Sequence, residues 1–395
     1  MLDSIYVGMT GLVGFSKGLK VIANDTANMN TPGFKSSQLQ FGDLFFGGSG
    51  QNGLAQDSSN NIGYGLNTYS TTLNFSQGEL RQTGNDLDLA IDGTGMFIVK
   101  TEDGRQLYSR AGQFKLNDDG VLVDKTDGSK VMGIDANGAM GEISIAGMRS
   151  SPGHASETVK FIGNLSSTVT DTTISNIIVY DNVGAQHTLS LVLKNTGATK
   201  SGSWSATLKD GDTEIGTGEI VFADGKPQAD AATLSFTYTP TDGTPVELKF
   251  DFSTDVTSYA AGNQSTLAFN SQDGYGAGQL TTVAFDGNGN LKLTYSNGQT
   301  QSGSRLALAS FDSADSVQQV GNNKFAQVST KGWHFGLAGD NGFGTIQGGR
   351  VEISNVDLSQ EFSDLVVMQR GYQASSQVVS TANEMLQELF NMKGK

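Results

Sequence analysis

The sequence predicts a mainly β protein whose two ends are α-helical. Apolar residues recur at helical spacing over residues 3–28 and 357–391, and alternating runs separated by glycine-containing turns fill the chain between them. We expect the N- and C-terminal helices to pair as a coiled-coil-like inner domain. The strands between them are expected to form a β-rich core domain and an inserted outer β-domain.

The N-terminal helix is predicted from apolar residues at three- and four-residue steps, and Pro32-Gly33 lies just beyond its end. Its apolar stripe consists of Ile5, Met9, Leu12, Leu19 and Ala23. The same segment contains Gly8, Gly11, Gly14 and Gly18. Each glycine costs about 1 kcal/mol relative to alanine, so this helix is not expected to be stable alone. Glycines also let another backbone approach closely, which favours ordering upon assembly.

The strands are predicted from alternation over residues 97–99, 114–116, 189–193, 234–238 and 291–295. Turn signals such as Asp119-Gly120 and Asn288-Gly289 separate them. Residues 47–67 are rich in glycine, serine and asparagine and indicate a mobile connection. The composition shifts near 146 and 270. We therefore expect a terminal helical assembly domain (1–30 and 357–395), an extended connector (31–71), a β-rich core (72–145 and 270–356) and an inserted outer domain (146–269).

The C-terminal helix starts at a predicted capping box, Asp357-Leu358-Ser359-Gln360, and no proline interrupts it. Its apolar stripe consists of Leu358, Phe362, Leu365, Tyr372, Val379, Leu386 and Phe390. A polar face lies roughly 100–140° around the helix and carries Gln373, Gln377, Ser380 and Glu384. Two interpretations stay open at this point: the helices pack inside one monomer, or they pack against other subunits.

Composition limits the possible partners. The 395 residues carry a net charge of −15 and no cysteine. Nucleic acid and anionic membrane surfaces are disfavoured, because binding them needs a basic patch. Disulfides and thiolate sites are excluded. No apolar run reaches 18 residues, so we expect no membrane insertion, and the first residues lack the pattern of a cleaved signal peptide.

No motif makes a convincing catalytic, metal or cofactor site, and we expect no enzyme. Residues 14–18 match the G-x-S-x-G pattern but fall inside a predicted helix, where a nucleophile elbow cannot form. The histidines, His154, His187 and His334, are far apart in sequence. The segment 286–297 lacks the glycine and glutamate that a calcium loop needs. Asp86, Asp88 and Asp92 alternate along a predicted strand and are expected on its solvent face.

Both ends of the chain resemble the flagellar rod and hook protein family. Residues 22–35 resemble its N-terminal signature, an asparagine-rich turn ending in Gly33-Phe34-Lys35, and residues 354–358 and 368–374 resemble its C-terminal signature. Residues 87–99 and 108–116 resemble the first strands of the family's core domain. Asp25 and Gly371 are mild departures. The recognisable parts cover roughly 1–145 and 270–395.

The resemblance implies a structural subunit of the bacterial flagellum, exported without a cleaved signal and polymerising with itself into a curved tube around an export channel. It implies four partners: the hook cap protein, the distal rod, the hook–filament junction proteins and the export apparatus. The polar face of the C-terminal helix would then face the channel. The insert at 146–269 favours a hook subunit, the universal joint between rod and filament. The alternatives are a distal rod or other axial protein and, from a different class, a secreted β-rich binding protein or hydrolase.

Overall fold

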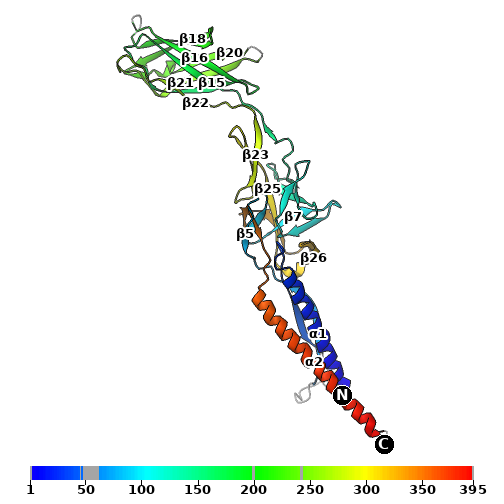
Figure 1. Cartoon of the computed structure of the whole chain (residues 1–395). Coiled ribbons are helices and arrows are strands. Elements are labelled where there is room, and N and C mark those ends of the chain that lie inside the picture. Colours follow the sequence, from blue (N-terminus) through cyan, green and yellow to red (C-terminus); the bar gives the residue numbers. More distant parts are fainter. Residues whose placement is uncertain (1, 45, 48–61, 198–200, 241–242, 394–395) are drawn as a thin grey trace, which may run out of the picture. The chain divides into compact units, whose positions relative to one another are not determined.

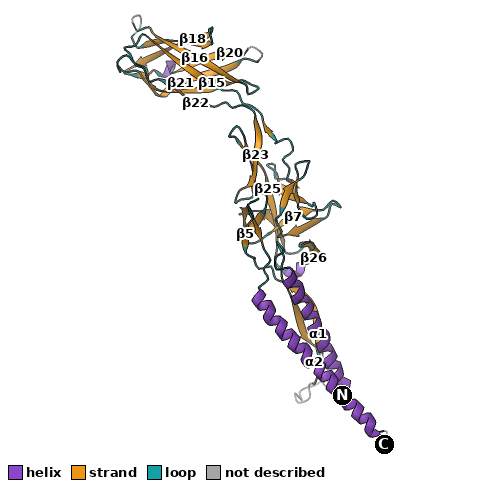
Figure 2. Ribbon diagram, viewed as in Figure 1, coloured by secondary structure: helices purple, strands orange, loops and turns teal. Residues whose placement is uncertain are grey.

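The computed structural model describes residues 2–44, 46–47, 62–197, 201–240 and 243–393. The chain forms two compact units. Unit 1 comprises residues 1–146, 283–292 and 302–395, and unit 2 comprises residues 147–282 and 293–301. Figure 2 shows a long series of strands between two terminal helices. The two helices pack against each other within unit 1 (Figure 1), which confirms the predicted fold class.

The two helices are α1 (Leu2–Ala27) and α2 (Leu358–Lys393). The start of α2 is capped by Asp357, whose Oδ1 accepts hydrogen bonds from the backbone N–H groups of Ser359 (2.8 Å) and Gln360 (3.3 Å). The Gln360 amide donates to Asp364 instead of turning back to Asp357. The structure therefore shows the hydrogen bonds to the Asp357 side chain, but not the reciprocal bond from the Gln360 side chain that a full capping box requires.

A β-ribbon lies against α1. Strand β1 (Ser37–Asp43) pairs antiparallel with β4 (Leu66–Leu73), in a register that runs from Ser37↔Leu73 to Asp43↔Leu66. The short strands β2 (Phe46–Gly47) and β3 (Ile62–Gly63) extend this ribbon. The predicted mobile connection at 47–67 lies largely outside the described residues.

The β-body of unit 1 is built on a sheet with the strand order β25-β11-β7-β8-β27-β26, in which β25 is Thr300–Phe311. Its aromatic core includes Tyr108, Phe325 and Trp333. Two further pairings, β29 with β6 and β30 with β5, fix the segment that leads into α2. The strands of this body are β5 (Leu80–Gln82), β6 (Leu89–Asp92), β7 (Met96–Lys100), β8 (Gln106–Ser109), β9 (Phe114–Leu116), β10 (Leu122–Asp124), β11 (Lys130–Ile134), β12 (Met140–Glu142), β26 (Val317–Gly321), β27 (Lys324–Gln327), β28 (Trp333–Leu337), β29 (Thr345–Gly348) and β30 (Arg350–Glu352).

Unit 2 contains two sheets, ordered β20-β21-β14-β22 and β15-β16-β17-β18-β19. One buried apolar cluster, with Trp204 and Phe250 among its largest members, joins the inward faces of both sheets. The boundary proposed at residue 269 lies inside β22. The strands of this unit are β13 (Ser150–Ser151), β14 (Thr158–Asn164), β15 (Asp171–Tyr180), β16 (Gln186–Asn195), β17 (Ser203–Asp210), β18 (Thr213–Ala223), β19 (Lys226–Pro227), β20 (Thr233–Tyr238), β21 (Val246–Thr257) and β22 (Ala268–Gln272).

The chain passes between the units in β23 (Gly278–Phe285), β24 (Asn290–Tyr295) and β25 (Thr300–Phe311). All five predicted strand segments lie within strands: β7, β9, β16, β20 and β24. The interpretation of Asp88 was wrong. Its side chain is buried and pairs with Lys125 Nζ at 2.6 Å. The alternating pattern was misleading because strand β6 begins only at Leu89 and is buried on both faces.

Candidate assembly interface

Helix α1 contacts α2 through glycines. Gly8, Gly11 and Gly18 are buried on one face of α1. A methyl carbon placed on Gly8 would lie 2.7 Å from Val379 Cγ2, and one on Gly11 would lie 2.5 Å from Ser375 Oγ. Both distances are shorter than van der Waals contact. The two helices are therefore closer than any larger residue at these positions would allow.

Two other glycines of the helices, Gly14 and Gly371, pack against larger side chains. Gly14 lies under Leu66 of the β1–β4 ribbon, and Gly371 of α2 lies against the ring of Phe15. The ribbon is also tied to α1 by Thr10, whose Oγ1 accepts the Leu66 N–H at 3.2 Å. Helix α1 is thus covered by α2 and the ribbon on neighbouring faces. The departure from the family signature at Gly371 has a physical role here, since it makes room for Phe15.

The residues predicted to form packing stripes occupy mixed positions. Half-buried are Ile5, Leu12, Leu19, Leu358, Leu365, Val379 and Leu386. Exposed are Met9, Ala23, Phe362, Tyr372 and Phe390. Among the half-buried residues, Val379 of α2 lies opposite Gly8 of α1. The apolar stripes therefore flank the helix contact while small residues form its centre, and their role between subunits stays a proposal.

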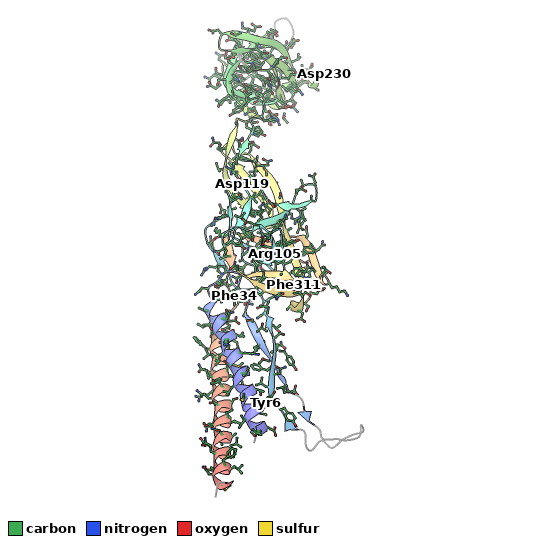
Figure 3. All side chains as sticks on the ribbon, turned by 90° about the vertical axis from the view of Figure 1, so that its right-hand side faces the viewer. Tyr6, Phe34, Arg105, Asp119, Asp230 and Phe311 are labelled. Carbon is green, nitrogen blue, oxygen red and sulfur yellow. The ribbon has the colours of Figure 1, made fainter. Side chains whose placement is uncertain are left out.

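Helix α1 carries an exposed apolar stripe of which the sequence analysis named only Met9. Leu2, Tyr6, Met9 and Val13 follow at steps of four, three and four residues, and each is more than half exposed. At 100° per residue, this stripe lies on the side of α1 opposite the buried glycines. Tyr6 is labelled on α1 in Figure 3. The four- and three-residue spacing of these residues is the signal that could have predicted the stripe. The predicted stripe followed Leu12 and Leu19 instead.

A second exposed apolar stripe runs along α2. It consists of Val367, Ala374, Val378, Met385, Leu389 and Met392. These residues also recur at helical steps, and they border the face that meets α1. The predicted channel-facing residues, Gln373, Gln377, Ser380 and Glu384, are all exposed on a different side of the helix. Both helices thus present apolar side chains that nothing in the described chain covers.

A buried ion cluster joins the two chain ends beside the helices. Glu352 Oε1 accepts from Lys35 Nζ at 2.6 Å, and Glu352 Oε2 accepts from Arg110 Nη1 at 3.0 Å. Burial lowers the pKa of both Lys35 and Arg110, while the Glu352 charge opposes this shift. Sequence reasoning missed this cluster because its members are separated by up to 317 positions.

A second polar junction lies at the ends of the helices. The carboxylate of Asp25 is buried and accepts the Ser37 N–H at 2.9 Å. Burial raises the pKa of Asp25 even though Ser37 hydrogen bonds lower it. Asn355 binds the segments on both sides of the ribbon: its Oδ1 accepts the Ser36 N–H at 2.8 Å, and its amide donates to the carbonyls of Asn74 and Ser76. Two residues of the quoted terminal signatures, Asp25 and Asn355, therefore hold α1, the ribbon and the start of α2 together.

The rejected chemical motifs are not assembled into sites. Residues 14–18 are helical throughout. His187 binds Asp181 at 3.0 Å, His334 binds Asp312, and His154 binds the Ala155 carbonyl. Across the described residues, no group of three or more histidine, aspartate or glutamate side chains is placed to hold a metal ion.

Helix α1 is long and apolar enough to cross a membrane by length and composition alone. The sequence analysis missed this because charged residues interrupt its apolar runs. In the structure, the buried face of this helix packs on α2 and on the ribbon.

Three family models match the chain in order. Residues 5–35 match the flagella basal body rod protein, residues 90–175 match the D1 domain of the flagellar hook protein FlgE/F/G, and residues 347–392 match the C-terminal part of the flagellar basal body rod FlgEFG protein. The first and third regions include both terminal signatures, and the second includes core strands. The chain is therefore similar to the flagellar rod and hook protein family at both ends and in part of its core.

Full-length relatives narrow the similarity to hook proteins. The chain is 28% identical to the flagellar hook protein FlgE of Borreliella burgdorferi over the whole of both chains. It is also 28% identical to those of Salmonella typhimurium and Escherichia coli over 98% of each chain. The crystal structure of Helicobacter pylori flagellar hook protein FlgE2 has the same fold, with a TM-score of 0.51, 13% identity, and coverage of 69% of this chain and all of that one.

Proposed function

We propose that this chain is a structural subunit of the flagellar hook, which polymerises into a curved tube that acts as a universal joint between rod and filament. The observation that carries the proposal is the helix pair with two uncovered apolar stripes, on a chain that aligns end to end with hook proteins. Uncovered stripes of this kind mark surfaces that become buried on association. We assign unit 2 to the outer part of the tube, where polar, weakly specific contacts would let subunits slide as the tube bends.

Electron microscopy of the purified chain under polymerising conditions tests this proposal. We expect tubes from the unmodified chain and none from the double variant Tyr6→Asp/Met9→Asp, since a charge at a desolvated contact costs several kcal/mol. Both side chains are about half exposed, so the subunit itself should fold normally. Val183→Asp makes the same chemical change at an exposed position of unit 2 and should leave tubes intact. A chain that stays monomeric under all conditions contradicts the proposal.

We propose in addition that Gln373, Gln377, Ser380 and Glu384 face the central channel. All four side chains are exposed in the subunit, and three of them are uncharged. An unfolded chain passing this surface would meet neither apolar patches nor dense charge. The variant Gln377→Leu/Ser380→Leu should assemble but slow the export of later subunits. A structure of the tube with these residues in subunit contacts would refute the assignment.

The packing residues have a proposed role as well. Leu365 and Leu386 are half-buried beside the helix contact, and we assign them, with the rest of the predicted stripes, to contacts within the helical layer of the tube. The proposed partners beyond the chain itself are the hook cap, the distal rod, the junction proteins and the export apparatus. The proposed location is the extracellular flagellum, the proposed route of export lacks a cleaved signal, and the proposed role is non-enzymatic.

Deletion of unit 2 separates the alternatives. A secreted binding protein or hydrolase would lose its activity with that unit. A hook subunit would keep the helix pair and the β-body on which assembly depends. A distal rod or other axial protein is distinguished by the tubes, which would be straight rather than curved.

A further inference from the structure

A groove opens between the start of α2, the end of α1 and the β1–β4 ribbon. It encloses about 680 Å³. Its lining includes the apolar residues Val21, Ile22, Leu39, Phe41, Leu73 and Met368, among polar ones such as Ser37, Gln40 and Thr72. Asp357, Glu361 and Asp364 line it on the side of α2. The groove therefore offers apolar contacts beside an acidic edge.

The acidic edge lacks a cation. Within the described part of the chain, no lysine or arginine forms an ion pair with Asp357, Glu361 or Asp364. The pKa of Glu361 is raised by burial and, in addition, by the nearby carboxylates of Asp25, Asp364 and Asp357. Like charges held together without a counter-charge favour a partner that brings positive charge.

The opposite end of the helix pair has the complementary character. Gly8 of α1 lies opposite Val379 of α2. From there α1 continues for six residues to Leu2, and α2 continues for fourteen residues to Lys393. The difference of eight residues corresponds to an overhang of about 12 Å. Figures 1 and 3 both show α2 running beyond the end of α1.

The overhang carries exposed apolar side chains together with the polar residues Gln387, Glu388 and Asn391. Leu389 is 45% exposed, and Phe390 and Met392 are each 72% exposed. The sequence that follows contains Lys393 and Lys395. The overhang also contains Glu388, so its positive charge lies only at its end, at Lys393 and the following Lys395. Apolar residues followed by lysines match a groove that offers apolar contacts beside an acidic edge.

We propose that the overhang of α2, residues 386–393, docks into the groove of a second copy of this chain. This inference rests on the proposed function and specifies which surfaces meet. The two surfaces lie on opposite ends of the same subunit, so the contact is head to tail and generates an open filament rather than a closed dimer. Each added subunit offers a new groove or a new overhang.

The proposal fixes a spacing. Phe390 in the overhang and Glu361 at the groove are 29 positions apart on one continuous helix. At 1.5 Å per residue this corresponds to about 44 Å. Successive subunits joined by this contact should therefore repeat at about 40–45 Å along the helix direction, which an image reconstruction of the tube measures directly.

Cysteine cross-linking tests the contact in the full chain, which has no native cysteine. We expect the pair Met392→Cys/Gln360→Cys, treated with a short bismaleimide in assembled tubes, to give a ladder of covalent oligomers. Each single variant should give dimers at most. The control pair Met392→Cys/Gln377→Cys should give no ladder, because Gln377 lies outside the groove. Tubes without a ladder from the groove pair overturn the docking alone. Absence of tubes from the unmodified chain overturns the proposed function and the docking together.

A charge exchange provides a second test. Asp364→Lys should raise the protein concentration needed for tube formation at least tenfold, and adding Lys393→Glu should restore most of the loss. Asp103→Lys makes the same change at an exposed site of the β-body and should have little effect. Unchanged assembly of the Asp364→Lys variant, or a failure of Lys393→Glu to restore it, counts against the docking.

Discussion

Replacement of Glu352 by glutamine should destabilise the β-body strongly. Glu352 is fully buried, with Lys35 1% exposed and Arg110 7% exposed at its two oxygens. Oε1 also accepts the Gly78 N–H at 2.9 Å. Glutamine has nearly the same shape and keeps one acceptor. It removes the only carboxylate that these two buried cations contact among the described ion pairs, and it turns an NH₂ donor toward one of them.

The magnitude follows from the loss of one partner in a buried ion cluster. Such a loss costs about 3–5 kcal/mol, because a desolvated charge stays behind without compensation. Burial already lowers the pKa of Lys35 and Arg110, so both cations depend on the acid. For a unit of this size each kcal/mol lowers Tm by about 2–4 °C. We therefore expect Tm to fall by roughly 10 °C.

Differential scanning calorimetry of the monomer measures this change. Asp103→Asn is the matched control, because it breaks the Arg105–Asp103 pair, in which both side chains are mostly exposed at 3.5 Å separation. Exposed pairs of this kind contribute less than about 1 kcal/mol. A Glu352→Gln variant within 1 kcal/mol of the control would refute the argument that this cluster is held by its carboxylate.

Three further predictions follow from the packing and the charges. Gly11→Val should weaken assembled tubes by about 1–3 kcal/mol per subunit, since even its Cβ would collide with Ser375. Gly141→Val is the control, because no neighbour lies near its Cβ. Equal melting temperatures for tubes of both variants would count against the close helix contact. Residues 147–276 expressed alone should melt cooperatively, whereas 147–269 should be less stable because it cuts β22; a structureless longer fragment would refute the unit. The raised pKa of Glu361 means that its charged form costs stability above that pKa and that protonation removes the cost as pH falls toward 4.5. In thermal unfolding of the monomer, Glu361→Gln should therefore show its largest gain in Tm over the unmodified chain near pH 7 and lose it on acidification, and a gain that grows on acidification would contradict this sign.

The secondary structure followed from local patterns. Both helices were predictable because stops such as Pro32-Gly33 and a cap such as Asp357 act within a few residues. The strands were predictable where one face is buried and the other wet, as in β20, whose burial alternates along its length. Asp88 was misjudged because strand β6 is buried on both faces, which alternation cannot reveal.

The candidate interface was less predictable. An apolar stripe at helical spacing indicates a buried face, yet the centre of the α1–α2 contact is made by Gly8, Gly11 and Gly18. Close approach of two backbones depends on the partner's small residues, such as Ser375, and a single helix does not reveal them. The Lys35–Glu352 pair depends on the folding of the whole unit, so no local pattern contains it.

The ties between the chain ends have a consequence for the timing of folding. Lys35 meets Glu352 across 317 positions, and Ser36 meets Asn355 across 319. Contacts this distant in sequence close large loops and form slowly. The β-body cannot be completed until residues near 350 have left the ribosome. For the export proposed above, this amounts to a built-in delay, because the segment that completes the β-body is synthesised after the other strands of that body.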